Sequence, residues 1–119
     1  MAVRIARVYD EPAADDGLRV LVDRLWPRGL RKDDARIDLW AKDIAPSTEL
    51  RRWYGHDPAK SQEFARRYRT ELESEPAASA LGDLLARARD SDLILTTATK
   101  DLELSQAKVL RDVIADSIS

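Results

Sequence analysis

Short apolar runs bounded by polar or helix-breaking residues predict the β-strands of this chain. Residues 3–9 alternate apolar and polar side chains at their start and are rich in residues that favour strands. Residues 19–25 have an apolar centre and end on charged residues, after which Pro27 and Gly29 break the pattern. Two further runs predict short strands of the same kind, residues 37–45 and residues 92–97.

Apolar residues at helical spacing predict four helices between and after these strands. The first begins after Ser47, a good N-cap residue, and ends at Gly55. The second follows Asp57-Pro58, which combines a capping side chain with a proline at the first helical position. The apolar face of the second helix consists of Phe64, Ala65, Tyr68 and Leu72. The last two helices are predicted over residues 77–89 and residues 102–117.

The order of these elements predicts the fold class. Early strands followed by a helix–strand–helix ending are typical of a sheet with helices packed on it. Right-handed crossovers make part of such a sheet parallel. We therefore expect an α/β fold with a small central, at least partly parallel sheet flanked by helices. No repeat or linker divides the 119 residues, so residues 1–119 are predicted to form a single domain.

Composition removes several classes of function. The chain has no cysteine, which excludes disulfides, thiolate metal ligands and cysteine nucleophiles. No apolar run approaches the roughly 20 residues of a membrane helix, and the N-terminus lacks a signal-peptide pattern. We expect a cytoplasmic protein that has no membrane partner and needs no cofactor.

Charge is unevenly distributed although the net charge is only −2. Residues 24–69 contain twelve Lys and Arg against seven Asp and Glu, a balance of +5, whereas residues 70–119 have a balance of −5. A basic middle segment suggests an anionic ligand or surface. The alternative is that these arginines reflect a compositional bias and solvated helix faces.

A candidate anion site lies where the second and last predicted strands end. In open α/β sheets, ligands bind outside the carboxyl ends of parallel strands. Arginine binds phosphate or carboxylate in a bidentate manner, and a helix beginning near Thr99 would add free backbone N–H groups. Asp23 could orient an arginine or act as an acid/base. The binding residues proposed here are Arg24, Arg28, Thr99 and Lys100, whereas the alternatives are an Asp23–Arg24 salt bridge and helix capping by Thr99 and Asp101.

A second pair of residues could form another wall of that pocket. Ser47 and Arg51 are four residues apart and share one helix face, where they could hold an anion. An N-cap beside an exposed arginine explains the same spacing. Trp26 could stack against a ring in the ligand, although tryptophan is more often part of a core.

Other chemistries have weaker sequence support. None of the four glycines forms a phosphate-binding loop, and His56 is the single histidine, so a zinc site is not expected. The acidic pairs Asp15-Asp16 and Asp33-Asp34 could bind Mg²⁺, but such residues are usually solvated. We predict no metal site. An alternative function, nucleic-acid binding or a regulatory interaction, would use Arg31, Lys32, Arg66, Arg67 and Arg69, although acidic residues interrupt this set.

Several segments together resemble one family. Arg7-Val-Tyr-Asp10, the long string from Gly17 to Gly29 that contains Val-Asp-Arg-Leu-Trp-Pro-Arg-Gly, and Trp40 to Arg51 are similar to the YeaO-like proteins, domain of unknown function 488. The similarity extends over nearly the whole chain. It implies a compact bacterial α/β fold and no settled activity. The family pattern commonly places Asn or His before a helical alanine where this chain has Gln106, so no imidazole role is implied there.

These observations favour a pocket for a small anionic ligand, phosphate or carboxylate, with the question of a reaction left open. The nucleic-acid or regulatory module is the second hypothesis. A third is a structural or partner-binding role, in which the arginines form internal ion pairs. The sequence leaves the oligomeric state open.

Overall fold

The central element is a four-stranded sheet in which every strand runs parallel to its neighbours. In the computed structural model, which describes residues 2–12 and 17–118, the strand order is β1-β4-β2-β3. The predicted α/β class and the parallel sheet are therefore confirmed. The strands are β1 (Val3–Arg7), β2 (Leu18–Leu21), β3 (Leu39–Trp40) and β4 (Leu93–Thr97).

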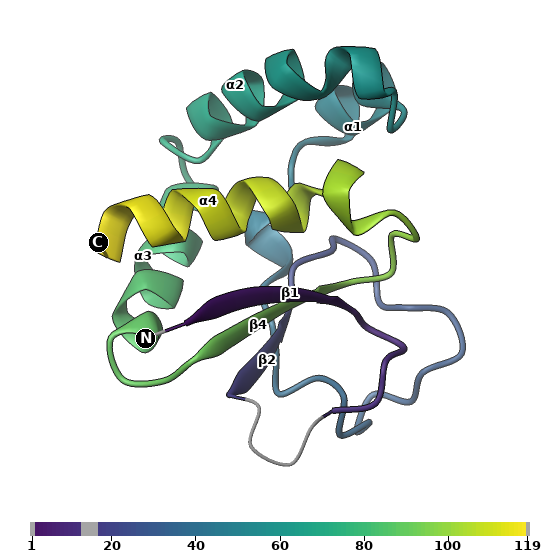
Figure 1. Ribbon diagram of the computed structural model, residues 1–119, viewed down its shortest axis with the longest axis vertical. Helices are drawn as coiled ribbons and strands as arrows, with labels where there is room; N and C mark the ends of the chain where they lie inside the picture. The colour runs from purple at the N-terminus through teal and green to yellow at the C-terminus, as the bar shows by residue number, and fades with distance from the viewer. Residues whose placement is uncertain (1, 13–16, 119) are drawn as a thin grey trace.

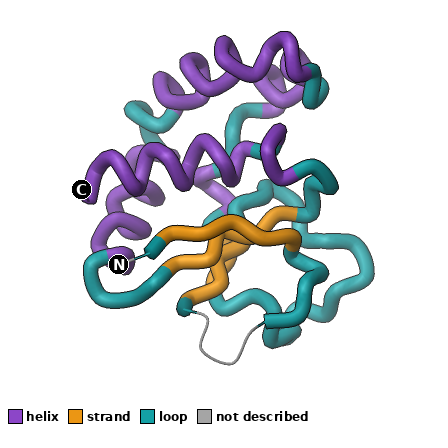
Figure 2. The backbone as a smooth tube through the Cα atoms, in the orientation of Figure 1, coloured by secondary structure: helices purple, strands orange, loops and turns teal. Residues whose placement is uncertain are grey.

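Four α-helices gather on one side of this sheet, whereas the opposite side carries loops (Figures 1 and 2). Helix α4 crosses directly over the strands, and α1 and α2 form an outer pair beyond it (Figure 1). The helices are α1 (Thr48–Tyr54), α2 (Ser61–Glu71), α3 (Ala77–Ala88) and α4 (Gln106–Ile118), with 3₁₀ turns η1 (Lys42–Ile44), η2 (Pro58–Lys60) and η3 (Leu102–Leu104).

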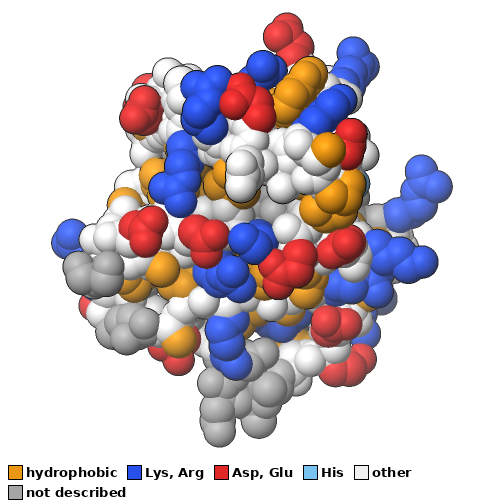
Figure 3. Space-filling model, turned by 45° about the horizontal axis from the view of Figure 1, so that its top comes forward, with side chains coloured by type: hydrophobic (Ala, Val, Ile, Leu, Met, Phe, Trp, Pro, Cys, Tyr) orange, Lys and Arg blue, Asp and Glu red, His pale blue; other side chains and the backbone are white. Residues whose placement is uncertain are grey.

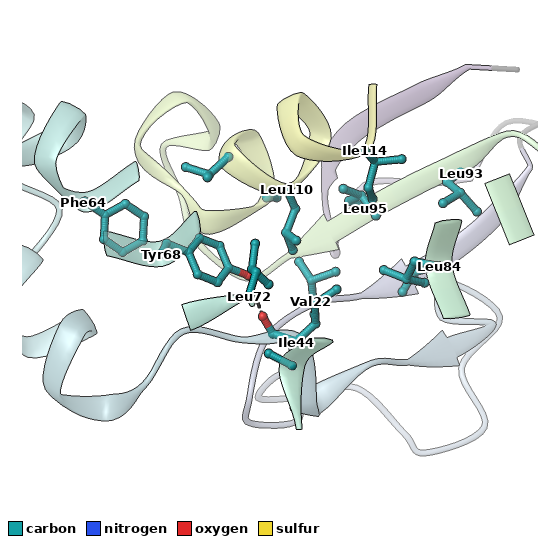
Figure 4. Packing of buried hydrophobic residues seen from close by; sticks show 14 of the residues in the cluster. Val22, Ile44, Phe64, Tyr68, Leu72, Leu84, Leu93, Leu95, Leu110 and Ile114 are labelled. Carbon is teal, nitrogen blue, oxygen red and sulfur yellow. Dashed lines mark hydrogen bonds between the residues drawn. The ribbon is translucent and has the colours of Figure 1, made fainter. Parts of the chain in front are cut away.

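The main core lies between the sheet and the helices (Figure 4). Val20 and Leu95 point into it from the central strands, because alternate strand residues face the same side. Leu84 of α3 and Leu110 of α4 cover them and are fully buried. The core reaches as far as Tyr68, and its other labelled members in Figure 4 are Val22, Ile44, Phe64, Leu72, Leu93 and Ile114.

Loops bury the other face of the sheet. Leu21, Ile94 and Thr96 are at most 2 % exposed although no helix covers that side. Arg19 of β2 is also buried, and its Nε donates a hydrogen bond of 2.8 Å to the carbonyl oxygen of Arg36. The central strand β4 is accordingly buried along its whole length, as expected for a parallel strand covered on both faces.

The predicted strand over residues 37–45 is mostly wrong. Only Leu39–Trp40 pairs with β2, and the chain then turns into η1. The apolar alternation there arises because η1 directs Ile44 into the core, not because the strand continues. Likewise, the strand predicted over residues 19–25 ends at Leu21.

The last helix begins later than predicted. Residues 102–104 form the separate turn η3, Ser105 has an extended backbone, and α4 starts only at Gln106. Asp101 caps η3 by accepting a hydrogen bond from the backbone of Glu103 at 3.1 Å. The capping interpretation of Asp101 is thus confirmed for this turn, and the apolar spacing alone did not distinguish the turn from the helix.

The predicted ends of α1 are confirmed, whereas the second helix begins later than predicted, because Asp57-Pro58 starts the 3₁₀ turn η2 and α2 follows at Ser61. Ser47 Oγ accepts a hydrogen bond from the Leu50 amide at 3.1 Å, and Gly55 ends α1 in a left-handed conformation with φ +54°. Asp57 caps η2 through the Ala59 amide. The Cα radius of gyration is 13.4 Å, close to the roughly 13.5 Å expected of a globular chain of this length. Among the described residues, no helix has the length and apolarity to cross a bilayer.

Candidate functional site

A pocket of about 530 Å³ lies at the carboxyl edge of the sheet, as predicted for a parallel arrangement. Figure 1 shows this edge as the end of the strands away from the N label. Its walls come from the loops after β1, β2 and β4 and from the end of α1, with Phe64 of α2 and Gln106 of α4 completing them. The polar and aromatic residues that line this pocket are Tyr9, Asp23, Arg24, Trp26, Arg28, Arg51, Arg52, Tyr54, His56, Phe64, Thr99 and Gln106.

Asp23 accepts three hydrogen bonds from the protein. Because Leu21 pairs with Thr96, the next residues of the two strands bring Asp23 beside the loop after β4. Its Oδ1 accepts from Thr97 Oγ1 at 2.7 Å and from Gln106 Nε2 at 2.6 Å, and its Oδ2 accepts from the Ala98 amide at 2.8 Å. The carboxylate therefore joins β2, β4 and α4 at the floor of the pocket.

Arg24 does not pair with Asp23. Its terminal Nη2 donates to the carbonyl oxygens of Ala45 and Pro46 at 3.1 and 3.3 Å. Within the described part of the chain, its buried Nε has no hydrogen-bond partner. The half-buried guanidinium lines both the main pocket and a neighbouring cavity of about 370 Å³. The alternative of an Asp23–Arg24 salt bridge is wrong because each side chain binds other groups.

Three exposed arginines surround the same pocket. Arg28 comes from the loop after β2, and Arg51 and Arg52 come from α1. No carboxylate among the described residues forms a salt bridge with any of them. Their charge is therefore available to a ligand.

The end of α1 also places an imidazole at the pocket. His56 follows the C-cap Gly55 and has a left-handed backbone with φ +54°, which is uncommon for a residue other than glycine. Its ring lies edge-on to Tyr54, 5.7 Å between centroids. Tyr54 in turn stacks on Phe64 at 4.0 Å, so this wall is aromatic.

Trp26 lies at the pocket but also belongs to a small aromatic cluster. Its Nε1 donates to the Leu30 carbonyl oxygen at 2.9 Å, and its ring meets Trp40 edge-on at 5.3 Å. The Lys32 ammonium lies 4.6 and 4.8 Å from these two ring centroids. Because these contacts hold one side of the indole, only its remaining surface faces the pocket.

Ser47 is near the pocket but not in it. Its amide and Oγ both donate to the Glu71 carboxylate, at 2.8 and 2.6 Å, while Oγ accepts from the Leu50 amide. Ser47 lines the smaller cavity beyond Arg24. The structure therefore separates the predicted pair, because Arg51 reaches the main pocket and Ser47 joins α1 to α2.

Thr99 and Lys100 are also separated. Thr99 lines the main pocket, but its amide donates to Thr97 Oγ1 at 3.1 Å. Lys100 is exposed and lines a different cavity of about 600 Å³ with Arg7, Asp101 and others. The expected α-helix N-terminus at 99–101 is wrong, because η3 follows Asp101 and α4 begins only at Gln106.

Several residues that line the pocket were not predicted from the sequence to belong to a binding site. Arg52 follows the nominated Arg51, and Gln106 and His56 had been noticed for other reasons. Tyr9 and Leu25 were not nominated as binding residues, although both remain exposed beside the pocket, 37 % and 71 %. A leucine that directly follows the charged pair Asp-Arg at a strand end is a sequence signal that could have indicated this rim.

The alternative basic surface is largely neutralised. Arg66 and Arg67 both bind Glu63, at 2.5 and 2.7 Å, and Arg69 lies 3.6 Å from Asp116. The hydrogen bonds from Arg66 and then Arg67 lower the pKa of Glu63 to about 2. On the face drawn in Figure 3, basic and acidic side chains are interspersed. This face is not the uniform basic surface that nucleic-acid binding favours.

The acidic pairs give no support to a metal site. Asp33 forms a salt bridge with Arg31 and Asp34 with Arg36, both at 3.4 Å. Asp15 and Asp16 lie outside the described residues. In residues 2–12 and 17–118, no three His, Asp or Glu side chains are grouped as metal ligands would be.

Comparisons with known proteins agree with the sequence resemblance. The uncharacterised protein Rv3073c of Mycobacterium tuberculosis is 49% identical over 112 residues, which cover 94% of this chain and 92% of that protein. The uncharacterised protein YeaO of Escherichia coli is 39% identical over 113 residues, 94% of this chain and 96% of that protein. No solved structure matches the chain. A family model described as the inactive DUF488-N3 subclade matches residues 2–119, and the chain therefore belongs to the DUF488 family.

Proposed function

We propose that this protein binds a small anionic ligand, a phosphate or a carboxylate, in the pocket at the carboxyl edge of the sheet. The observation that carries the proposal is a set of three exposed arginines around that pocket that have no carboxylate partner among the described residues: Arg28, Arg51 and Arg52. Elsewhere, several other arginines are paired with acids, such as Arg36, Arg66 and Arg87. An anion would supply the missing partner for these pocket residues.

The local charge balance supports the same assignment. Asp23 is the acidic side chain of this pocket, and donors from Thr97, Ala98 and Gln106 already surround its oxygens. Asp23 therefore opposes an anion less than a bare carboxylate would. Arg24 adds a fourth guanidinium at the base of the pocket, although part of it binds backbone carbonyls.

Binding without turnover fits the site best. A general base needs a lone pair within reach of the substrate proton. Three of the roughly four acceptor positions of the Asp23 carboxylate are taken by donors of the protein, which favours a positioning role for it over proton transfer. The subclade described for this chain is also called inactive. We propose that Asp23 positions the pocket loops and that the protein acts as a binding module. We also propose a cytoplasmic location, which is in keeping with a chain that lacks cysteine.

Calorimetric titration of the full chain tests this function, with inorganic phosphate and succinate as separate probes. We expect Arg28→Ala and Arg51→Ala each to weaken binding at least about tenfold, because a charge-assisted hydrogen bond contributes roughly 1.5–3 kcal/mol. The matched control is Arg87→Ala, an exposed helical arginine that binds Asp83 and lies away from the pocket residues.

Two results would overturn the proposal. One is the absence of binding for both anions at millimolar concentration. The other is a loss of anion affinity in Arg87→Ala that equals the loss in the two pocket variants. Tight binding of a single-stranded oligonucleotide with a steep dependence on salt, lost in Arg66→Ala, would instead support the nucleic-acid alternative.

A further inference from the structure

The rim of the pocket carries the two large apolar side chains that remain exposed among the described residues. Leu25 is 71% exposed and Tyr9 is 37% exposed, and both line the same cavity as the arginines. A single exposed leucine on a protein surface is ordinary. Two large apolar groups beside one concave site instead indicate a surface that a ligand covers.

Hydrogen bonds fix both sides of this rim. The Tyr9 hydroxyl donates to the Arg28 carbonyl oxygen at 3.0 Å, which ties the loop after β1 to the loop after β2. Leu25 lies between Asp23, held by its carboxylate, and Trp26, held through its indole N–H. The exposure of Leu25 is therefore a property of an anchored loop.

The wall contributed by α1 and α2 is aromatic. Tyr54 and Phe64 stack with an interplanar angle of 11°, and the His56 ring meets Tyr54 edge-on. Tyr54 and Phe64 are 4 % and 2 % exposed and therefore back this wall, whereas Leu25, Tyr9 and His56 are exposed in the cavity beside the guanidinium groups. The cavity, at about 530 Å³, falls within the roughly 300–1,000 Å³ of small-molecule sites, and a bare phosphate would leave most of it empty.

We infer that the ligand carries a flat apolar ring next to its anionic group, as in an aryl phosphate or an aromatic carboxylate. This inference rests on the proposed anion-binding function. The ring contacts Leu25 and Tyr9, where burial of apolar surface favours binding, while Arg28, Arg51 and Arg52 bind the charged end. Leu25 and Tyr9 then set the specificity of the site for aromatic over simple anions.

The test is the ratio of two affinities measured by calorimetry on the full chain. Phenyl phosphate is compared with inorganic phosphate, and benzoate with acetate, so that the two arms distinguish phosphate from carboxylate ligands. We expect at least one aromatic member to bind tenfold or more tightly than its simple partner. Leu25→Ser should lower that ratio at least threefold, whereas Leu25→Met, which keeps an apolar side chain, should preserve it.

The outcomes separate this inference from the proposed function. Equal affinity for aromatic and simple anions overturns the inference and leaves anion binding in place. Benzyl alcohol binding as tightly as the aromatic anions also overturns it, because the charged end would then contribute nothing. Absence of binding by all four anions overturns both. Thermal unfolding of Leu25→Ser serves as a check that the variant is folded, since this side chain is exposed in the wild type.

Discussion

At the residue scale, Asp23 shows how one side chain can be structural and define a site at the same time. Its sequence position, directly after an apolar strand, correctly indicated the pocket edge. Its partners Thr97, Ala98 and Gln106 are 74, 75 and 83 residues away along the chain. The sequence therefore indicated where Asp23 lies but not that its carboxylate accepts three hydrogen bonds from the protein. The acid/base role stays a prediction, and these bonds support the positioning role that we propose.

Replacing this carboxylate with an amide tests the positioning role. In Asp23→Asn an NH₂ group must face at least one of the N–H or O–H donors. We expect a loss of about 1–3 kcal/mol in the free energy of unfolding, because a buried donor loses its acceptor. Urea denaturation measures it. The control Asp90→Asn, at an exposed position after α3, should change stability by no more than about 0.5 kcal/mol, and equal effects of the two variants would contradict the role.

At the element scale, local capping signals were more reliable than apolar spacing. Ser47 and Gly55 mark the ends of α1 as predicted, because a cap acts within a few residues. Asp57 also caps as predicted, although the element that it begins is the turn η2 and not α2 itself. The spacing of apolar residues was wrong for η1 and η3. A 3₁₀ turn can direct residues such as Ile44 into the core without any regular period.

Helix α3 contains a glycine that contributes nothing visible to packing. Gly82 lies in the interior of the helix, and a Cβ added there would meet no atom within 4 Å. We expect Gly82→Ala to stabilise the protein by about 0.5–1 kcal/mol, because alanine loses less backbone entropy in a helix. Thermal unfolding measures the gain. Gly17→Ala is the opposite control, since its Cβ would lie 2.0 Å from the Asp92 carbonyl oxygen, and stabilisation by both changes would refute the argument.

Helix α2 should make stability depend on acid pH through Glu63. Hydrogen bonds from Arg66 and Arg67 lower its pKa from 4.5 to about 2 in the folded chain. Between these values the unfolded chain binds more protons, so stability falls as the pH drops from about 4.5 towards 2. We expect the free energy of unfolding of Glu63→Gln to fall less steeply than that of wild type over this pH window. The variant should be least stable relative to wild type above pH 4.5.

Chemical denaturation at pH 2.5, 3.5, 4.5 and 6.5 measures this effect. Glu73→Gln is the matched control, because Glu73 is exposed and forms no salt bridge with any described residue. Parallel pH profiles for wild type and Glu63→Gln would rule out the interaction as a source of stability.

At the scale of the whole molecule, one core connects the sheet with every helix. The buried cluster includes Leu50 of α1, Tyr68 of α2, Leu84 of α3 and Leu110 of α4, together with Leu95 of β4. Tyr68 also donates a hydrogen bond to the Ile44 carbonyl oxygen at 2.6 Å (Figure 4). Burial raises the pKa of this hydroxyl well above its ordinary value, so it remains a donor.

A shared core predicts that residues 1–119 unfold as one unit. We expect Leu95→Ala, at a fully buried position, to cost about 2–5 kcal/mol because it removes buried methyl groups and leaves a cavity. Circular dichroism and tryptophan fluorescence should follow the same transition in wild type and variant. Two separate transitions in the wild-type chain would contradict the prediction of a single domain.

The sequence by itself determined the α/β class, the approximate positions of most strands and helices, and the family to which the chain belongs. These properties depend on periodicity, capping residues and contiguous motifs, all of which act over short stretches of chain. Only the tertiary structure decided which basic residues face one pocket. Arg28, Arg51 and Arg52 line the same pocket, with Leu25 at its rim. Ser47 and Lys100 each line a different cavity. These groupings join segments far apart in sequence, and such contacts are fixed by packing and not by local pattern.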